Sequence, residues 1–561
     1  MRYDLVIRGG NVVDGTGLPG YTADIGVRGG RIAAIGRIDE PAQRVVDADG
    51  LVVAPGFIDV HTHYDVQLDW DPVASPSMQH GVTTVLTGNC GFTLYPSKPE
   101  DVDWLTGMLT RVEGMSRDAM REGFRFGGGG FADYWSRLEG KIALNVGGYV
   151  GHCAVRRYVM GDAASERAET PAEIAQMQAL VRQAMREGAV GFSTSQLDLH
   201  VGADGRGVPS NFATPEEITA LCSVLAEFPY GAVEIIPRSH GIGHDDADRA
   251  LLLAIAHASG KPIELGPLGP TPDQPMAWQR TLEFTREARA QGVRLHPQFT
   301  TQRLGLHLRL ADTFVFDEMP SWLRALTGST ALRCRALADP AVRDQLRHDL
   351  ATITRAAPFP IQILEVEHVR DPANRALVGR SAAEIAGERG GDALDAFLDV
   401  SIAEDLATGW KVRAIPAAQE FIANVVRASV RDPLVMAGSS DGGAHLASFV
   451  GADYTTLLLT DWVPDPLTLE HAVWRLAGMP AAVHGLVDRG VIRTGAKADL
   501  TLFDLANLAA GEHTVVNDFP AGTERYYVDA QGYEMVIVNG VPAMEQGKPT
   551  GALPGEVLRG A

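Results

Sequence analysis

The chain contains little cysteine and lacks a long apolar run. Its 561 residues include four widely spaced cysteines and no CxxC pair, namely Cys90, Cys153, Cys222 and Cys334. A disulfide framework is therefore not expected. No uninterrupted apolar stretch is long enough to span a bilayer, and the opening MRYDLVIRGG lacks the apolar segment of a signal peptide. These features predict a cytoplasmic protein that does not insert into membranes.

Positive charge is also scarce. The 49 Lys and Arg residues face 70 Asp and Glu residues, which gives a formal net charge of -21. Such an acidic surface disfavours nucleic acids and anionic membranes as partners. We expect a small-molecule amide substrate, and we also expect a homo-oligomer. Apolar residues make up 45% of the chain, as in globular proteins, and a chain of this length divides into two or more domains.

Both ends of the chain carry the pattern of short strands. In the first fifty residues, Gly-Gly pairs separate short β-branched runs, which is a hairpin signal. Residues 498–503 and 533–538 repeat this pattern near the other end. We therefore predict that residues 1–54 and 485–561 together form one composite β domain.

The region from 55 to 484 alternates strand-like and helix-like segments. This alternation predicts a parallel sheet, and eight strands fit a closed (β/α)8 barrel. An open doubly wound sheet is the rival, but it needs a phosphate-binding glycine turn where His61 and His63 stand. Long insertions are expected near 101–140 and 305–432. The expected strands are 57–60, 83–86, 144–150, 189–193, 232–236, 262–265, 293–296 and 434–438.

Four residues at expected strand ends suit a metal site. His61 and His63 follow the first strand, and residues two apart in a strand point to the same side. Cys90 follows the second strand, where a thiolate can meet a metal ion, although buried cysteines are most often simply apolar. Asp441 follows the last strand. A carboxylate there can ligate the metal and act as the general base, or it can merely cap a turn.

Other polar residues at strand ends are candidates for substrate binding. Hydrogen-bond donors at the mouth of a barrel can hold a substrate, and arginine suits a carboxylate. The alternative for each is an ordinary loop hydrogen bond. The candidates are His152, Arg156, Ser193, Arg238, His296 and Arg303.

The chain resembles the amidohydrolase superfamily and, within it, the D-aminoacylase-like N-acyl-D-amino-acid deacylases. The resemblance rests on stretches along nearly the whole chain, among them DLVIRGGNVVDGTG, APGFIDVHTHYD, HGVTTVLTGNCGF, AGSSDGGAHL and TGAKADLTLFD. It implies a distorted (β/α)8 barrel with a β-sandwich built from both termini. It also implies one or two zinc ions, His61 and His63 as first-strand ligands, Cys90 as a ligand and Asp441 as the catalytic aspartate.

The chain departs from this family at two strands. The family places a histidine at the end of strand five and another at the end of strand six, and this chain has neither. The candidates for replacing them are Glu234, Glu264, His240, His244 and His296. The expected function is hydrolysis of a C–N amide bond, most simply in an N-acyl-D-amino acid. A cyclic-amide hydrolase of the hydantoin or lactam type and a non-catalytic small-molecule-binding relative are the alternatives.

Overall fold

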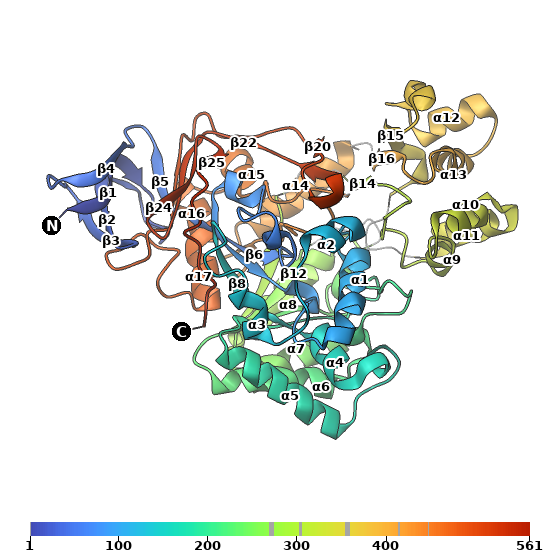
Figure 1. Ribbon diagram of the computed structural model, residues 1–561, viewed down its shortest axis with the longest axis horizontal. Helices are drawn as coiled ribbons and strands as arrows, with labels where there is room; N and C mark the ends of the chain where they lie inside the picture. Colours follow the sequence, from blue (N-terminus) through green and yellow to red (C-terminus); the bar gives the residue numbers. More distant parts are fainter. Residues whose placement is uncertain are drawn as a thin grey trace.

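A sheet built from both ends of the chain forms one side of the molecule. The computed structural model describes residues 2–268, 274–301, 306–353, 359–412, 416–446 and 448–560. Strand β5 pairs antiparallel with β18, so the N-terminal and C-terminal strands join directly. The apolar faces of these strands enclose a core of their own, which includes Ile7, Val27 and Leu502. Figure 1 shows this sheet beside the barrel. The fold predicted for the termini is thereby confirmed.

The strands of this sheet run in the order β25-β24-β23-β18-β5-β1-β2-β3, with β4 also paired to β1. Their bounds are β1 Tyr3–Val12, β2 Tyr21–Arg28, β3 Arg31–Gly36, β4 Ala42–Asp47, β5 Val52–Pro55, β18 Leu500–Phe503, β23 Tyr533–Val538, β24 Val541–Glu545 and β25 Lys548–Pro549.

The central region is a closed barrel of parallel strands. One run of parallel pairing joins β6, β7 and β8, and another joins β9, β10, β11, β12, β13 and β17. β8 and β9 are two halves of one strand, and Tyr149 between them donates its N–H to the Thr87 carbonyl. A bridge between Thr62 and Gly442 closes the ring. The barrel expected from the sequence is therefore present.

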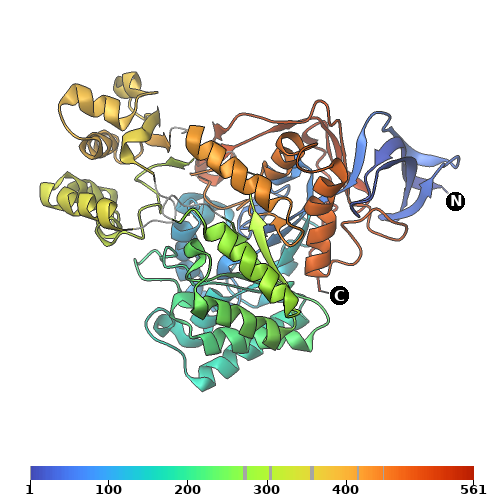
Figure 2. The same cartoon turned by 180° about the vertical axis from the view of Figure 1, so that it is seen from behind.

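The barrel strands are β6 Phe57–Thr62, β7 Val82–Thr87, β8 Asn145–Gly148, β9 Val150–Gly151, β10 Gly191–Ser195, β11 Ala232–Ile236, β12 Ile263–Pro267, β13 Leu295–Phe299 and β17 Met436–Ala437. Figure 2 shows the helices that cover the outside of the barrel. These are α4 His152–Met160, α5 Pro171–Arg186, α6 Pro215–Ser223, α7 Asp246–Ser259, α8 Ala277–Ala290, α14 Pro416–Ser429, α15 Tyr454–Asp461, α16 Leu469–Val473 and α17 Met479–His484. Among the described residues, no helix is both long and apolar enough to cross a membrane.

The first insertion carries three short helices, α1 Val102–Val112, α2 Arg117–Gly123 and α3 Phe131–Ser136. The glycine run that precedes α3 is anchored, because Gly129 and Ser97 exchange both backbone hydrogen bonds. Phe126 packs edge-on against Tyr134 with the ring centres 5.0 Å apart. These contacts fix the glycine run within the insertion.

The second insertion has its own apolar core, built from residues between 308 and 410. It projects from the barrel on the side opposite the sheet of the termini (Figure 1). Helix α14 is not part of it, since Val426 and Val430 belong to the main core. The insertion therefore ends before the predicted residue 432. Its elements are β14 His307–Leu308, α9 Pro320–Ala325, α10 Thr330–Ala338, α11 Pro340–Thr352, β15 Leu364–His368, α12 Ala382–Arg389, α13 Ala393–Ala403 and β16 Gly409–Val412.

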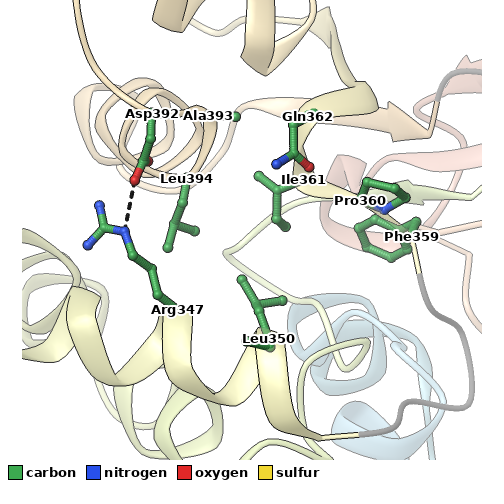
Figure 3. Close-up of a pocket in the computed structure, with 10 residues that line it drawn as sticks. Arg347, Leu350, Phe359, Pro360, Ile361, Gln362, Asp392, Ala393 and Leu394 are labelled. Atoms are coloured by element: carbon green, nitrogen blue, oxygen red, sulfur yellow. Dashed lines mark hydrogen bonds and ion pairs between the residues drawn. The ribbon is translucent and has the colours of Figure 1, made fainter.

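A cavity of about 540 Å³ lies within this insertion, between α11 and the start of α13. Figure 3 shows its largely apolar lining, which includes Leu350, Ile361 and Leu394. The Arg347 Nε–H donates to Asp392 at 2.8 Å on its rim. None of the predicted metal ligands lines this cavity, so it is separate from the site at the mouth of the barrel.

The segment between β18 and β23 contacts both the barrel and the second insertion. It contains two small ladders, β19 Ala509–Ala510 with β22 Ala530–Gln531 and β20 Thr514–Val516 with β21 Arg525–Tyr527. Tyr526 donates its N–H to Leu446 of the barrel, and Arg309 of the insertion pairs with Glu524 at 3.1 Å.

Candidate active site

Three predicted metal ligands meet at the mouth of the barrel. His61 and His63 leave the end of β6 on the same side, and Cys90 follows β7. Ligand atoms of the three residues all lie within 4.8 Å of one another. The Cys90 Sγ is 3.4 Å from the His61 Nε2. All three side chains are buried, so the group is sheltered from bulk water.

The loop that carries Cys90 is held in a left-handed turn. Cys90 has a φ of 56°, which is uncommon for a residue with a side chain. Ser193 on β10 bonds this loop twice, because its Oγ donates to the Gly88 carbonyl and accepts the Gly91 N–H at 3.2 Å. The Cys90 N–H donates to the Glu234 Oε2 at 2.7 Å. Ser193, a predicted substrate-binding residue, therefore has its hydroxyl engaged in positioning the cysteine.

Asp441 approaches the same group from the last strand. Its Oδ1 lies 3.4 Å from the His61 Nε2 and 3.8 Å from the His63 Nε2. The loop is again left-handed, since φ is 49° at Asp441 and 51° at His445. Backbone strain of this kind concentrates at functional sites. The Asp441 side chain is 26% exposed against 2% for His61, which leaves the carboxylate open to an incoming molecule.

The structure adds two residues that were not assigned from the sequence, Glu113 and His445. Glu113 follows α1 and is buried. Its Oε1 is 3.4 Å from the His63 Nδ1, and its Oε2 is 3.6 Å from the His445 Nε2. His445 stands in the same conspicuous loop as Asp441. Glu113 carries no local signal, because only tertiary folding brings the first insertion to β6.

The charges of this site fit a bound cation. Burial raises the pKa of Glu113 well above its ordinary range, and Asp441 adds to the shift. Burial also raises the pKa of Asp441 to about 7 and that of the Cys90 thiol. In contrast, burial lowers the pKa of His61 to about 3. Acidic groups crowded beside neutral imidazoles ionise readily once a cation lies among them.

An unsatisfied polar atom supports the same conclusion. Within the described part of the chain, the Glu234 Oε1 is buried beside the Cys90 loop without a hydrogen-bond partner. Such groups are costly unless something occupies the site. Imidazole nitrogen, thiolate sulfur and carboxylate oxygen are the ligands that zinc takes in proteins. The residues present therefore fit a zinc ion.

Two predicted substrate-binding residues lie in a closed ionic network instead. The His152 Nδ1 bonds Thr194 at 2.8 Å, and its Nε2 bonds Glu217 at 2.6 Å. Arg156, which is fully buried, pairs with Glu217 and with Glu169. Apart from the Arg156 Nε, the polar atoms of both side chains are engaged away from open space. The prediction that His152 and Arg156 bind substrate is corrected accordingly, because α4 turns them toward α6.

The remaining predicted substrate residues have different positions. Arg238 follows β11 and is partly exposed, where it pairs with Asp198. His296 was expected at the end of a strand, but β13 spans Leu295–Phe299, so His296 lies at its beginning. Its Nδ1 faces the Leu434 carbonyl at 3.1 Å. The prediction that His296 lines the mouth is therefore wrong. Arg303 lies outside the described residues.

The residues considered as replacements for the missing histidines lie in different places. Glu264 is engaged below the site, with His484 at 2.8 Å and the Tyr149 hydroxyl at 3.2 Å. The His240 Nε2 faces the Pro267 carbonyl at 2.9 Å, and His244 packs against Phe284. Of these acidic and imidazole side chains, Glu234 is the one bonded to the Cys90 loop.

Comparisons with known proteins agree with this site. Residues 44–544 match the model of the amidohydrolase family. A D-aminoacylase of Alcaligenes xylosoxydans xylosoxydans is 32% identical, and the match covers 99% of this chain and 97% of that protein. The structure of an N-acyl-D-glutamate deacylase of Bordetella bronchiseptica, complexed with zinc and a phosphonate inhibitor, is 26% identical with a TM-score of 0.68, over 100% of both chains.

A D-aminoacylase with a binuclear metal centre is 28% identical with a TM-score of 0.67, over 99% of this chain and 100% of the other. These matches run from the sheet of the termini through the barrel and both insertions. This chain is a member of the amidohydrolase family.

Proposed function

We propose that the protein is a zinc-dependent hydrolase of C–N amide bonds that acts on N-acylated D-amino acids. The observation that carries this proposal is the buried His61–His63–Cys90 group with the Asp441 carboxylate beside it. The similarity to proteins named D-aminoacylase and N-acyl-D-glutamate deacylase supports the substrate class, since it extends over nearly the whole chain. We assign His61, His63 and Cys90 as zinc ligands, with Asp441 as a further ligand and the general base.

The residues of the site divide the chemistry between them. Zinc, when bound, polarises the amide carbonyl and lowers the pKa of a water molecule to about 7. The Asp441 carboxylate accepts a proton from the attacking water and passes it to the nitrogen of the departing amine. His61 and His63 would hold the zinc ion beside Asp441, because their Nε2 atoms both lie within 4 Å of its Oδ1. The Ser193 and Glu234 bonds fix Cys90 in place.

We propose Arg238 as the residue that meets the carboxylate of the substrate. A guanidinium group binds a carboxylate through paired N–H donors. Arg238 lies beyond the end of β11 and is partly exposed, with Asp198 as its present partner. Arg238→Ala is expected to raise KM for the best substrate about tenfold or more while leaving kcat near normal.

Metal analysis followed by a substrate screen tests the proposed function. Purified protein is expected to contain at least one zinc per chain. In the screen, N-acyl-D-amino acids should release a free amine faster than their L-isomers do, and faster than hydantoins and lactams open. Preferred ring opening would instead establish the cyclic-amide alternative. Zinc-free protein that binds these ligands without turnover would establish a non-catalytic relative.

We further propose that the protein acts in the cytoplasm as a homo-oligomer. The four free cysteines support a reducing compartment. Sedimentation velocity on the purified chain tests the oligomer, because a single species near 60.0 kDa would contradict it.

A further inference from the structure

We propose that Glu113 positions the metal ligand His63 and connects the zinc site to both insertions. This inference rests on the proposed function, because it assigns a role beside the proposed zinc ion. Glu113 follows α1 in the first insertion, far in sequence from β6 and from the loop after β17. It nevertheless lies between two histidines of the site.

The geometry separates the two nitrogens of the His63 ring. The Nε2 faces Asp441 at 3.8 Å, toward the Cys90 and His61 side chains. The Nδ1 faces the opposite way, to the Glu113 Oε1 at 3.4 Å. A ligand histidine commonly gives one nitrogen to the metal and donates the N–H of the other to a carboxylate. Such a carboxylate fixes the tautomer and the orientation of the ring. Glu113 stands where that partner belongs.

The second carboxylate oxygen of Glu113 extends the connection. The Oε2 lies 3.6 Å from the His445 Nε2, and the backbone N–H of His445 donates to the Glu113 carbonyl. The loop that carries Asp441 and His445 is thus tied to Glu113 through side chain and backbone. One buried glutamate holds both the metal ligand and the loop of the proposed base.

The second insertion contacts the same group. The ring of Phe314 lies over His445 with the centres 4.4 Å apart. Arg111, on the last turn of α1, pairs with Asp317 of the second insertion. Phe314 and Asp317 precede α9, where the insertion leaves the barrel. The second insertion therefore contacts Arg111 and His445, the neighbours of Glu113, and is linked to His63 through them and Glu113.

Replacement of Glu113 tests this role without relying on activity. Glu113→Gln keeps the size of the side chain but removes its charge. We expect zinc affinity, measured by chelator competition, to fall about tenfold to a hundredfold with the number of ions per chain unchanged. The visible spectrum of the Co²⁺-substituted protein should change as well. Glu113→Asp keeps the charge and should recover part of the affinity, and it also serves if the Gln variant folds poorly.

Glu367→Gln is the matched control. Glu367 also pairs with an imidazole Nδ1, that of His307 at 2.8 Å, and also joins the second insertion to the rest of the chain through Tyr526. It contacts no proposed metal ligand among the described residues. We expect Glu367→Gln to lower the melting temperature while zinc affinity and the Co²⁺ spectrum stay as in the unmodified protein.

Three results would overturn the inference, and they can be told apart. Unchanged zinc affinity and spectrum in Glu113→Gln would show that Glu113 does not position His63. Loss of a whole ion per chain would make Glu113 a ligand. An equal loss of affinity in Glu367→Gln would reduce the effect to general destabilisation. An unmodified protein that binds no zinc would instead contradict the proposed function itself.

Discussion

Two sides of the barrel hold similar residues in different states of pairing. On one side, His61, His63 and Cys90 crowd around a shared point, and the Glu234 Oε1 beside the Cys90 loop lacks a hydrogen-bond partner among the described residues. On the other side, His152 and Arg156 bond to Thr194, Glu169 and Glu217, and of their polar atoms the Arg156 Nε is left without a partner among the described residues. Histidine and charged groups occur in both.

This difference separates the residues that we assign to metal binding from the residues that we assign to stabilising the fold. Buried polar groups are normally satisfied, because an unpaired one costs free energy of about 1–3 kcal/mol. The network around Arg156 meets that requirement from within the protein for the polar side-chain atoms other than the Arg156 Nε. The group around His61 leaves the Glu234 Oε1 unpartnered among the described residues, and we expect a bound ion to stabilise it. We therefore expect changes on the first side to affect metal and turnover, and changes on the second side to affect folding.

The largest effect is expected from His61→Ala combined with His63→Ala. Removing both imidazoles leaves only Cys90 and Asp441 near the proposed ion, so zinc content and turnover should both fall to background. Elemental analysis and kcat measure the result. Normal zinc content with normal activity would show that His61 and His63 are not the metal ligands.

Asp441→Asn should lower turnover more than it lowers zinc content. The amide keeps the size of the side chain and its place in the turn, but it cannot accept a proton as a base. We expect kcat to fall about a hundredfold or more while the fold and part of the zinc remain. The measurement is kcat on the best substrate, beside a thermal melt. Near-normal turnover in a folded variant would place the base elsewhere.

Arg156→Met should affect stability and not zinc binding. The change removes the cation between two buried carboxylates, and breaking such a group costs about 3–5 kcal/mol of folding free energy. Zinc per folded chain should not change. Denaturant unfolding and elemental analysis check both parts. A loss of zinc without a loss of stability would show that the two sides are not separate.

The smallest effect concerns His296 and pH. Burial lowers the pKa of His296 from 6.5 to about 4. Between these values the unfolded chain binds more protons than the folded one, so stability decreases as the pH falls from 6.5 toward 4. The linkage allows at most about 3 kcal/mol. His296→Gln removes this titration. Its melting temperature should therefore fall less on acidification, whereas parallel curves for both proteins would contradict the expectation.

Most of the fold was predictable from the sequence. Apolar runs of strand length, spaced by helical segments, place all eight barrel strands, because burial on both faces imposes that pattern. The boundaries were less accurate. The strand expected at 293–296 is β13 at Leu295–Phe299, and this shift moved His296 away from the mouth. Periodicity does not fix where a buried run starts and ends.

The sequence by itself determined the barrel, the joining of the termini, and the residues His61, His63, Cys90 and Asp441 as one site. Each of them lies at the end of a parallel strand or in the loop that follows it, so the parallel topology brings them to the same end. Only the tertiary structure decided which other polar residues join them. Glu113 reaches His63 across the first insertion, and Glu234 reaches the Cys90 loop from β11. His152 and Arg156 turn away. Tertiary packing decides which residues far apart in the chain come into contact, and the local sequence does not indicate these contacts.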